Sequence, residues 1–362
     1  MVQCLAGWGL VRRFAAGEGP AALAVWPAVL VLKPLHGDEA LLEEALASAC
    51  AQDYPRFRVV CGVQDPEDAA IAVVGRLRVR FPGVGIALVV DATAHGRNRK
   101  VANLINMVAA GPGLGADEVV VIADSDIHAE PDWLRGVVAG LAVPGVGLVT
   151  TLYAGRAAGA GWVARLGCTA ITHGFLPGAL LARAMGRQDC LGATMALRAD
   201  TLASVGGLPA LSAHLADDNE LGRLVRGRGL GVALAATVPT TTVAEGRLGA
   251  LLSHELRWAR TIRALVPAAF AASVVQYPIA WAGLAAVVAP GATTLGLLGM
   301  AWGVRAVAGW GIDRALSVTG ATRVPVGLLP LRDVVSVGVV LAVFAGRRVR
   351  WRGAVLEAGA VR

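Results

Sequence analysis

The feature that most constrains this chain is a stretch, residues 264–304, that contains no Asp, Glu, Lys or Arg. A helix needs about 20 apolar residues to cross a bilayer core, so the stretch is long enough for two helices joined at Pro290-Gly291. A buried hairpin in a soluble core is the alternative, but core helices are usually shorter and amphipathic. We therefore predict membrane-spanning helices, with residues 328–346 as a weaker third candidate because Arg332 and Asp333 interrupt it.

The charge distribution supports a membrane rather than a nucleic acid as partner. The net charge is +7, but no Lys/Arg block carries interleaved aromatic residues, so we predict no nucleic-acid binding. Arginines instead flank the apolar segments, which suits anionic headgroups on the cytoplasmic face. These arginines are Arg257, Arg260, Arg263, Arg347, Arg348, Arg350 and Arg352. The five cysteines form no C-x-x-C pair, which favours reduced, cytosol-facing thiols.

The N-terminal segment, residues 1–24, is apolar at first but too short to span a bilayer. Arg12, Arg13 and Glu18 interrupt it, and no small-residue cleavage site follows, so we expect no secretory signal. A short amphipathic anchor and a start codon placed too late both fit this pattern.

The next part of the chain alternates between strand and helix patterns, which predicts a doubly wound, mostly parallel sheet. Strands are predicted at 28–33, 57–63, 85–90, 118–123, 147–151 and 192–198, and helices at 39–50, 67–80, 97–108 and 131–141. Ligands of such sheets bind beyond the carboxyl ends of the strands. Asp65, Asp91 and Asp124 follow strand ends.

The motif Asp124-Ser125-Asp126 follows a buried strand directly. If the chain stays extended there, the two carboxylates share one face and repel each other unless a cation lies between them. Mg²⁺ binds such oxygen ligands together with substrate phosphates. The alternative is an ordinary turn, since Asp and Ser favour turns and helix caps.

Two further acidic motifs have both a functional and a structural interpretation. In VQDPED, Asp65 could bind a ribose hydroxyl or a base, or it could cap a helix with Pro66 in the first turn. In LADDNELG, Asp217 and Asp218 open a predicted helix. A carboxylate there can act as a general base, or it can simply cap the helix and favour its dipole.

The motif HELRWARTIR places Arg257, Arg260 and Arg263 on one helical face. Arginine binds diphosphate bidentately, but Arg and Trp also anchor helices at a membrane surface. The six histidines show no metal-ligand spacing, and His173 in THGFLPG is placed to line a pocket.

The order of these motifs is more specific than any one of them. An Asp after the second strand, D-x-D after the fourth, two Asp at a later helix and Arg-Trp before apolar helices is typical of membrane-bound inverting glycosyltransferases. The blocks LKPLHGDE, VQDPED, NRKVANLIN, DSDI, GATMALR and HELRW resemble the ceramide glucosyltransferase family, glycosyltransferase family 21. HGDE, HGRNRKVANLINM, THGFLP and HELRWARTIR are closer to its bacterial, hopanoid-biosynthesis branch.

The resemblance implies a GT-A-type sheet followed by C-terminal transmembrane helices, and a role for each matched residue. Asp218 would be the general base, and Asp124 and Asp126 would hold Mg²⁺ or Mn²⁺ with the diphosphate of UDP. The other implied donor-site residues are Asp65, Lys100, Arg257 and Trp258, and His173, Asp217 and His254 are assigned to the acceptor side or the pocket. Two features depart from the family: Gln or Arg often stands where His254 does, and the N-terminal transmembrane helix is missing or shortened.

The sequence thus predicts an inverting transferase in the bacterial inner membrane, with its catalytic domain facing the cytoplasm. The expected reaction moves N-acetylglucosamine from UDP-GlcNAc to a hopanoid polyol, bacteriohopanetetrol, with a β-linkage. A UDP-glucose-dependent ceramide or diacylglycerol glucosyltransferase is the alternative, and a catalytically inactive lipid- or nucleotide-binding protein is the rival that is not an enzyme. We expect a catalytic domain at 25–255, a basic interfacial helix at 256–263, a membrane region of two to three helices at 264–346 and a basic tail at 347–362.

Overall fold

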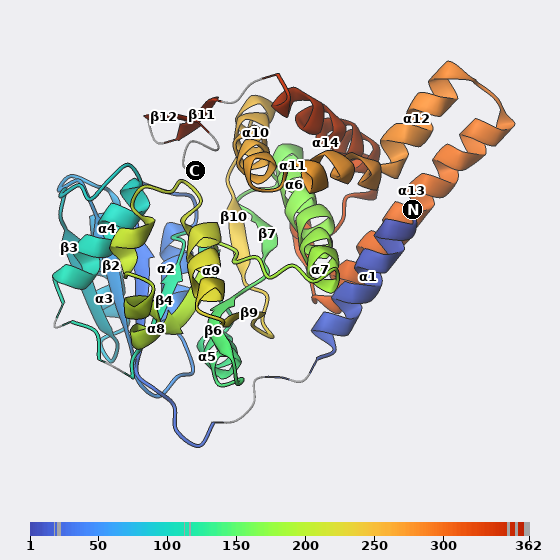
Figure 1. The fold of residues 1–362 in the computed structure, drawn as a ribbon. Helices are drawn as coiled ribbons and strands as arrows, with labels where there is room; N and C mark the ends of the chain where they lie inside the picture. Colours follow the sequence, from blue (N-terminus) through green and yellow to red (C-terminus); the bar gives the residue numbers. More distant parts are fainter. Residues whose placement is uncertain are drawn as a thin grey trace. The chain divides into compact units, whose positions relative to one another are not determined.

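The computed structural model describes residues 1–17, 19, 23–111, 113–115 and 117–345, and the backbone of 348–351 and 354–357. The chain forms two compact units that are interleaved along the sequence (Figure 1). We call residues 17–154 and 186–242 the sheet unit, and residues 1–16, 155–185 and 243–362 the helical unit. The catalytic domain predicted at 25–255 therefore spans both units, because residues 155–185 and 243–255 fall in the helical unit.

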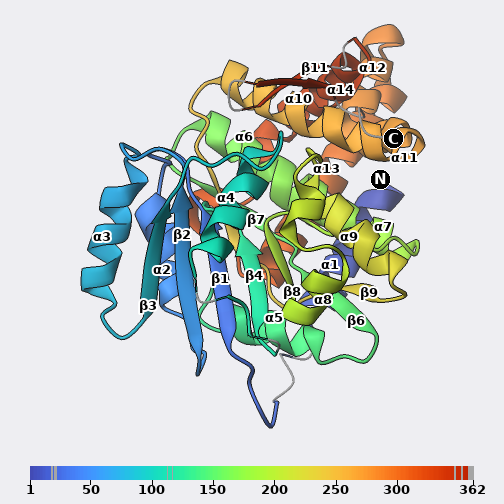
Figure 2. The same cartoon turned by 60° about the vertical axis from the view of Figure 1, so that its left-hand side comes forward.

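The sheet unit contains a seven-stranded sheet in the order β3-β2-β1-β4-β8-β6-β9 (Figure 2). Its neighbours pair in parallel except β8, which is antiparallel to both β4 and β6. The mostly parallel sheet is confirmed, while the reversed strand was not foreseen. The strands are β1 (Val29–Pro34), β2 (Phe57–Val63), β3 (Gly85–Val90), β4 (Val119–Ala123), β6 (Val146–Thr150), β8 (Thr194–Arg198) and β9 (Gly231–Leu234).

Helices cover both faces of this sheet, which explains why its central strands are continuously apolar. On β1, Val29 and Val31 face α2 (Leu42–Cys50), α3 (Ala70–Arg80) and α5 (Trp133–Leu141). Leu30 and Leu32 pack in the opposite layer with α4 (Arg99–Ala109), α8 (Ala199–Ser204) and α9 (Asp217–Gly227). The four helices predicted between the strands are present, each beginning later than expected.

A second sheet has three strands in the order β5-β10-β7, with β7 at Ala154–Ala157, and its β5–β10 pair lies beside the end of β4. The antiparallel pair joins β5 (Ile127–His128) to β10 (Thr240–Val243), with Thr241 opposite Ile127. The pair brings residues far apart in sequence next to the turn that follows β4, so β10 can supply a side chain to that turn.

The helical unit contains the apolar segments. Among the residues that the structure describes, two helices are long and apolar enough to cross a membrane, Ala292–Ala315 (α13) and Val326–Val343, and a bent pair, Pro267–Gln276 and Pro278–Val288, is a third candidate. The pair bends by 62°, and the predicted turn at Pro290-Gly291 separates α12 from α13. The elements are α1 (Val2–Ala15), α6 (Trp162–Ala170), η1 (Ile171–Phe175), α7 (Leu176–Ala184), α10 (Leu248–Leu265), α11 (Pro267–Ala272), η3 (Ser273–Gln276), α12 (Pro278–Val288), η5 (Val326–Leu328) and α14 (Leu329–Val343).

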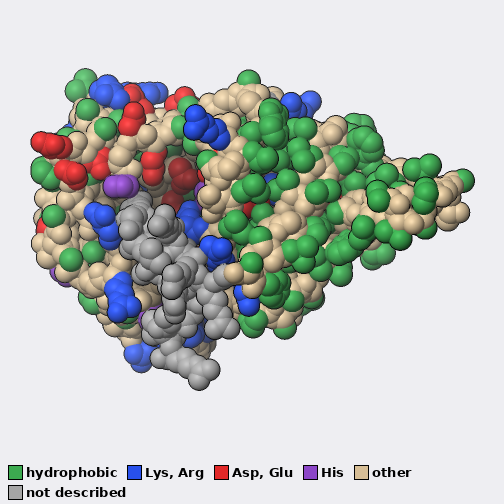
Figure 3. Space-filling model, turned by 90° about the horizontal axis from the view of Figure 1, so that it is seen from above, with side chains coloured by type: hydrophobic (Ala, Val, Ile, Leu, Met, Phe, Trp, Pro, Cys, Tyr) green, Lys and Arg blue, Asp and Glu red, His purple; other side chains and the backbone are tan. Residues whose placement is uncertain are grey.

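The candidate membrane-spanning helices of this unit carry apolar side chains on their outer surface and charged side chains in their interior. Hydrophobic side chains cover α12 and α13 (Figure 3), and Val287, Val288 and Leu295 are mostly exposed. Arg305 and Asp333, in contrast, are buried. A lipid surround suits this arrangement, because intramembrane charges face the bundle interior.

The N-terminal helix α1 packs within the helical unit through glycines. An added Cβ on Gly7 would lie 2.9 Å from the Pro177 Cβ of α7, and one on Gly311 of α13 would lie 2.1 Å from the Trp8 indole. Small residues allow this close helix approach in membranes. The segment predicted as a short anchor is therefore a packed helix of this unit.

The C-terminal part shows two differences from expectation. The interfacial helix predicted at 256–263 is part of the longer α10, where Arg263 contacts the Val343 carbonyl and the Phe344 ring. Of the predicted basic tail, only the backbone of β11 (Arg348–Trp351) and β12 (Ala354–Glu357) lies within the described residues.

Candidate active site

The D-x-D motif begins where β4 ends, and the chain turns there. The Ile127 N–H donates to the Asp124 carbonyl at 3.4 Å, closing the turn, so the extended geometry considered for this motif is wrong and the turn is correct. The Lys33 Nζ, buried on β1, donates to the same Asp124 carbonyl at 2.8 Å and to Ile127 at 3.4 Å. Lys33 thus stabilises the turn through two backbone carbonyls. Burial lowers the pKa of Lys33 to about 8, although the charges of Asp126 and Asp124 oppose this change.

Asp126 is held on the inner side of this turn by β10. The Thr241 hydroxyl donates to Asp126 Oδ2 at 2.6 Å, and the Thr242 N–H donates to the Asp126 carbonyl at 3.1 Å. Burial and the neighbouring Asp124 raise the pKa of Asp126 to about 6. Burial and the charge of Asp124 therefore both disfavour the ionised form of Asp126.

Lys100 reaches this motif from the first turn of α4. Its Nζ lies 2.6 Å from Asp124 Oδ1 and 3.7 Å from Asp217 Oδ2. Burial opposes the charge of the lysine, but the two carboxylates outweigh burial and raise its pKa. Lys100 therefore stays charged and joins the D-x-D turn to α9.

The asparagines of NRKVANLIN explain how α4 presents Lys100. Asn98 is the N-cap and accepts from the Val101 N–H at 3.1 Å, while its side-chain amide donates to Asp217 Oδ1 at 3.3 Å. One turn and two turns later, Asn103 donates to the Gly62 carbonyl of β2, and Asn106 donates to the Asp91 carbonyl. The motif thus ties one helix to three neighbouring segments.

Asp217 and Asp218 open α9, as predicted, but neither side chain caps it. Burial and then Asp217 raise the pKa of Asp218 to about 6, although a hydrogen bond from the Asn219 N–H and the charge of Lys100 oppose this. Gly192 lies under the carboxylate, since an added Cβ would be 3.1 Å from Asp218 Oδ2. A carboxylate with a raised pKa accepts protons near neutral pH.

Asp65 is exposed just after β2 and does not cap the following helix. Its Oδ1 accepts from the Glu67 N–H at 2.9 Å, which forms a local turn. Asp68 instead accepts from the Ala70 N–H at the start of α3. The N-cap interpretation of Asp65 is therefore wrong, and its nucleotide-binding role stays a prediction.

The four remaining predicted residues belong to the helical unit. His173 lies on η1 with its Nε2 2.7 Å from Asp313 Oδ1. His254 on α10 hydrogen-bonds Glu245 and packs edge-on against Trp258. Arg257 lies one helical turn further on and helps lower the pKa of Glu245. Their predicted roles stay predictions.

Three residues of the site were missed by the sequence analysis: Lys33, Thr241 and Tyr153. Burial raises the pKa of the Tyr153 phenol, and the carboxylates of Asp218, Asp124 and Asp126 add to the effect. The one usable signal was Lys33, a lone lysine within an apolar strand. Such a residue needs buried oxygen partners.

The donor set fits a divalent cation that is shared with a substrate. Across the described residues, no three His, Cys, Asp or Glu side chains converge as ligands. Asp124 and Asp126 nonetheless lie together with mutually unfavourable charge. Mg²⁺ commonly takes one or two carboxylates and completes its shell with phosphate oxygens and water.

Comparison with known proteins agrees with this geometry. A ceramide glucosyltransferase of Komagataella phaffii is 33% identical over 104 residues, which span 27% of this chain and 19% of that enzyme. The mannosyltransferase PcManGT of Pyrobaculum calidifontis, solved with GDP-Man and Mn²⁺, shares 18% identity over 95% of this chain and 94% of its own, with a TM-score of 0.54, and thus shares the GT-A-type fold. The family described as Glycosyl transferase family 21 matches residues 1–360. With almost its whole length matched, the chain belongs to glycosyl transferase family 21.

Proposed function

We propose that this protein is a membrane-bound, inverting glycosyltransferase that moves a sugar from a UDP-sugar to a lipid hydroxyl. The observation that carries the proposal is the cluster at the carboxyl end of β4. There Lys100 joins Asp124 to Asp217, and Asp218 has a raised pKa beside them. The cluster offers both a place for a diphosphate and a proton acceptor.

Asp218 acts as the general base in this mechanism. It takes the proton of the acceptor hydroxyl while that oxygen forms a bond to C1 of the sugar. The bond from C1 to the diphosphate oxygen breaks on the opposite face, and UDP leaves with the electron pair. One displacement inverts the anomeric centre, which gives a β-linked product from an α-linked donor.

The remaining residues of the cluster stabilise the leaving group. Asp124 and Asp126 would hold Mg²⁺ or Mn²⁺, which supplies positive charge to the departing diphosphate when bound. Lys33 holds the backbone of the turn through the Asp124 carbonyl, and Thr241 holds the Asp126 carboxylate. Asp65, Arg257 and Trp258 are proposed donor-site residues on the resemblance alone.

The proposed acceptor is an amphiphile, because apolar helices account for much of the same chain. Our first choice is a hopanoid polyol that receives N-acetylglucosamine, on the motifs that resemble the bacterial branch. The alternative is a ceramide or diacylglycerol that receives glucose, and the similarity to a yeast ceramide glucosyltransferase favours it. We place the protein in the bacterial inner membrane with the sheet unit in the cytoplasm.

The test uses membranes that contain the full chain, radiolabelled UDP-GlcNAc or UDP-Glc, Mg²⁺ or Mn²⁺, and bacteriohopanetetrol or ceramide. We expect label in the lipid extract from UDP-GlcNAc with bacteriohopanetetrol, and loss of that label on chelation. Label only from UDP-Glc with ceramide would keep the mechanism and change the substrates. Membranes carrying Asp218→Asn are the matched control.

An absence of transfer to every lipid, with UDP still bound, would reject the enzyme and favour a binding protein of the same fold. Transfer that survives complete chelation would remove the proposed cation from the mechanism. Determining the product's anomeric configuration by NMR checks inversion separately.

A further inference from the structure

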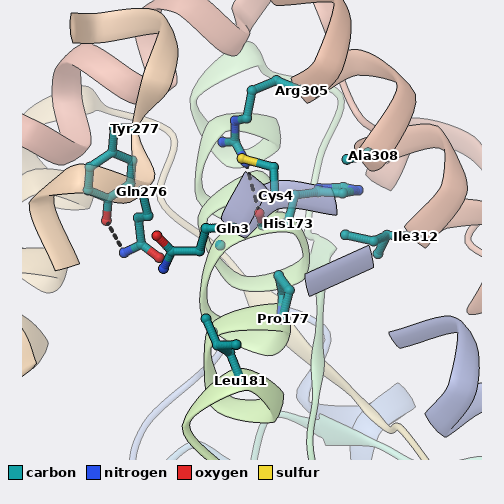
Figure 4. A pocket seen from close by; sticks show the side chains of 13 residues that line it. Gln3, Cys4, His173, Pro177, Leu181, Gln276, Tyr277, Arg305, Ala308 and Ile312 are labelled. Carbon is teal, nitrogen blue, oxygen red and sulfur yellow. Dashed lines mark hydrogen bonds between the residues drawn. The ribbon is translucent and has the colours of Figure 1, made fainter. Parts of the chain in front are cut away.

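The helical unit contains a small cavity that the transfer mechanism does not use. Its volume is about 40 Å³, and segments from α1, η1, α7, η3 and α13 line it (Figure 4). Part of the lining is apolar, including Pro177, Leu181 and Ile312, and part is polar, including His173 and Arg305. The segment η1 is a turn of π-helix, a geometry that is frequent at functional sites.

Two buried polar atoms in this lining have no hydrogen-bond partner. They are the Nδ1 of His173 and the Nε of Arg305, on side chains that are 3% and 8% exposed. Their other nitrogens are used: His173 Nε2 contacts Asp313, and Arg305 donates to Asp333 and to the His173 carbonyl. An unpaired buried polar group is costly, so both atoms indicate a missing partner.

The hydrogen bonds already present define what that partner must do. Because His173 Nε2 faces a carboxylate, it carries the proton, and in the neutral ring Nδ1 is then an acceptor. The Nε–H of Arg305 is a donor. A hydroxyl has the chemistry that both atoms lack, since its oxygen can accept from an N–H such as that of Arg305 and its O–H can donate to a ring nitrogen such as that of His173.

The charges around the cavity argue against an anionic partner. The buried ion pairs of this region contain two arginines, Arg305 and Arg332, and three carboxylates, Asp313, Asp333 and Glu255. Whether His173 is counted as neutral or protonated, these groups carry no surplus positive charge for a phosphate. A neutral, hydroxyl-bearing group fits this balance better.

We propose that this cavity is a binding site for a hydroxyl group of a membrane amphiphile. The volume has room for about two or three water-sized groups, which suits the end of a hydroxylated headgroup rather than a whole lipid. The exposed apolar surface of α12 and α13 leaves the rest of such a molecule in the bilayer. The proposal goes beyond the transfer reaction and does not require it.

Cys4 provides a direct reporter of occupancy. It lines the cavity and is partly exposed, whereas the other four cysteines are buried. The full chain in phosphatidylcholine nanodiscs is labelled with a membrane-permeant maleimide at increasing fractions of bacteriohopanetetrol. We expect labelling to slow about tenfold when this lipid reaches ten times its Kd, and no slowing with the parent hopane that lacks the hydroxyls.

A cavity-filling variant tests the location. At Gly178 on α7, an added Cβ would meet only Gln276 Oε1 at 3.9 Å, so Gly178→Leu can extend into the cavity without a backbone clash. The matched control is Gly296→Leu on α13, where nothing lies within 4 Å of the added Cβ. Protection of Cys4 should vanish in the first variant and persist in the second.

Equal protection of Cys4 by bacteriohopanetetrol and by the hydroxyl-free hopane would overturn the proposal. Protection by neither lipid would also overturn it, since the cavity would then hold only water.

Transfer kinetics in the same nanodiscs identify the molecule that supplies the hydroxyl. A KM for the acceptor that rises in Gly178→Leu identifies the bound molecule as the substrate. An unchanged KM with lost protection identifies a separate hydroxylated lipid. A wild-type protein without transfer activity would reject the proposed function, while the labelling result would still decide this inference.

Discussion

Both units bury charged groups, but they balance them differently. In the helical unit each buried carboxylate faces a specific cation or ring nitrogen, as in Arg332 with Glu255 at 2.6 Å and Arg305 with Asp333 at 2.9 Å. In the sheet unit three aspartates, Asp124, Asp217 and Asp218, act on Lys100, and Asp126 lies near Asp124 and Lys33. Burial raises the pKa values of Asp126 and Asp218, and the neighbouring aspartates add to this effect.

The difference favours the sheet-unit cluster as the place where chemistry occurs. In a balanced buried pair, removing one partner mainly harms folding, because the other charge is left buried and unpaired. A surplus of carboxylates costs stability unless a cation or a proton joins them, and perturbed pKa values of this kind gather at functional sites. The same residue types thus form balanced pairs in one unit and, in our proposal, the reactive cluster in the other.

The largest effect is expected for Asp218→Asn, which tests whether the charged cluster of the sheet unit performs the reaction. Without a proton acceptor, we expect turnover to fall by about 10²- to 10⁴-fold, while UDP binding stays within about twofold because the nucleotide contacts remain. Radiolabel transfer and calorimetric UDP titration measure the two quantities. A variant that retains full turnover would remove Asp218 from the mechanism.

Double substitutions sharpen the contrast between the units. Arg332→Met should cost about 3 kcal/mol because it leaves the Glu255 carboxylate buried and unpaired, and adding Glu255→Leu should restore most of the loss. Thermal unfolding in detergent gives both values.

The matched pair in the sheet unit is Lys100→Met alone and together with Asp124→Asn. Adding Asp124→Asn should restore the free energy of unfolding that Lys100→Met removes. Sugar transfer should stay low, because both residues serve the donor site in the proposed mechanism. Recovered transfer in the double variant would show that this pair, like the first, is structural.

The pH dependence follows from the raised pKa of Asp218. The base must be ionised, so kcat/KM should fall about tenfold per pH unit below pH 6. The free energy of unfolding changes with pH in the opposite direction. The folded protein holds the Asp218 proton more tightly than the unfolded chain does, so this proton stabilises the fold fully below about pH 4. The stabilisation is lost as the pH rises through 6. Asp218→Asn should therefore stabilise the fold at pH 7 by roughly 1–3 kcal/mol. A flat stability difference between pH 4 and 7 would contradict the shift.

Gly192→Ala is the mildest change. Its Cβ would press on Asp218 Oδ2 at 3.1 Å, so we expect kcat to fall a few-fold with KM for the donor unchanged. Gly75→Ala on α3 is the control, because nothing lies within 4 Å and the helix should gain about 0.5–1 kcal/mol. Equal kinetics for both variants would show that the Asp218 position tolerates the displacement.

The local patterns of the sequence were enough to predict the parallel strands, the helices between them and the apolar segments. They also located Asp124, Asp126, Asp217 and Asp218, because carboxylates at strand ends and helix starts converge on one edge of a sheet. Lys100 was predicted through the family resemblance of the block NRKVANLIN. In the structure, Asn98 and Asn103 of this block hold the helix that carries Lys100.

The rest depended on contacts between distant residues. Nothing near Thr241 shows that β10 pairs with β5, and nothing in β8 shows that it runs against its neighbours. The turn at Asp124 depends on Lys33, which is far away in the sequence. Residues 155–185 resemble the flanking sequence in composition, so only their packing reveals the unit to which they belong.

The interleaving of the two units has a consequence for synthesis. The first segment belongs to the helical unit, the second to the sheet unit, residues 155–185 to the helical unit, 186–242 to the sheet unit, and the residues from 243 onward to the helical unit. A ribosome therefore releases no complete unit until late in translation: the sheet lacks β8 and β9 for most of that time, and the helical unit is completed only by its last segments. Neither unit can be excised as one continuous fragment, so exchanging the sheet unit between relatives requires two segments and four matched junctions.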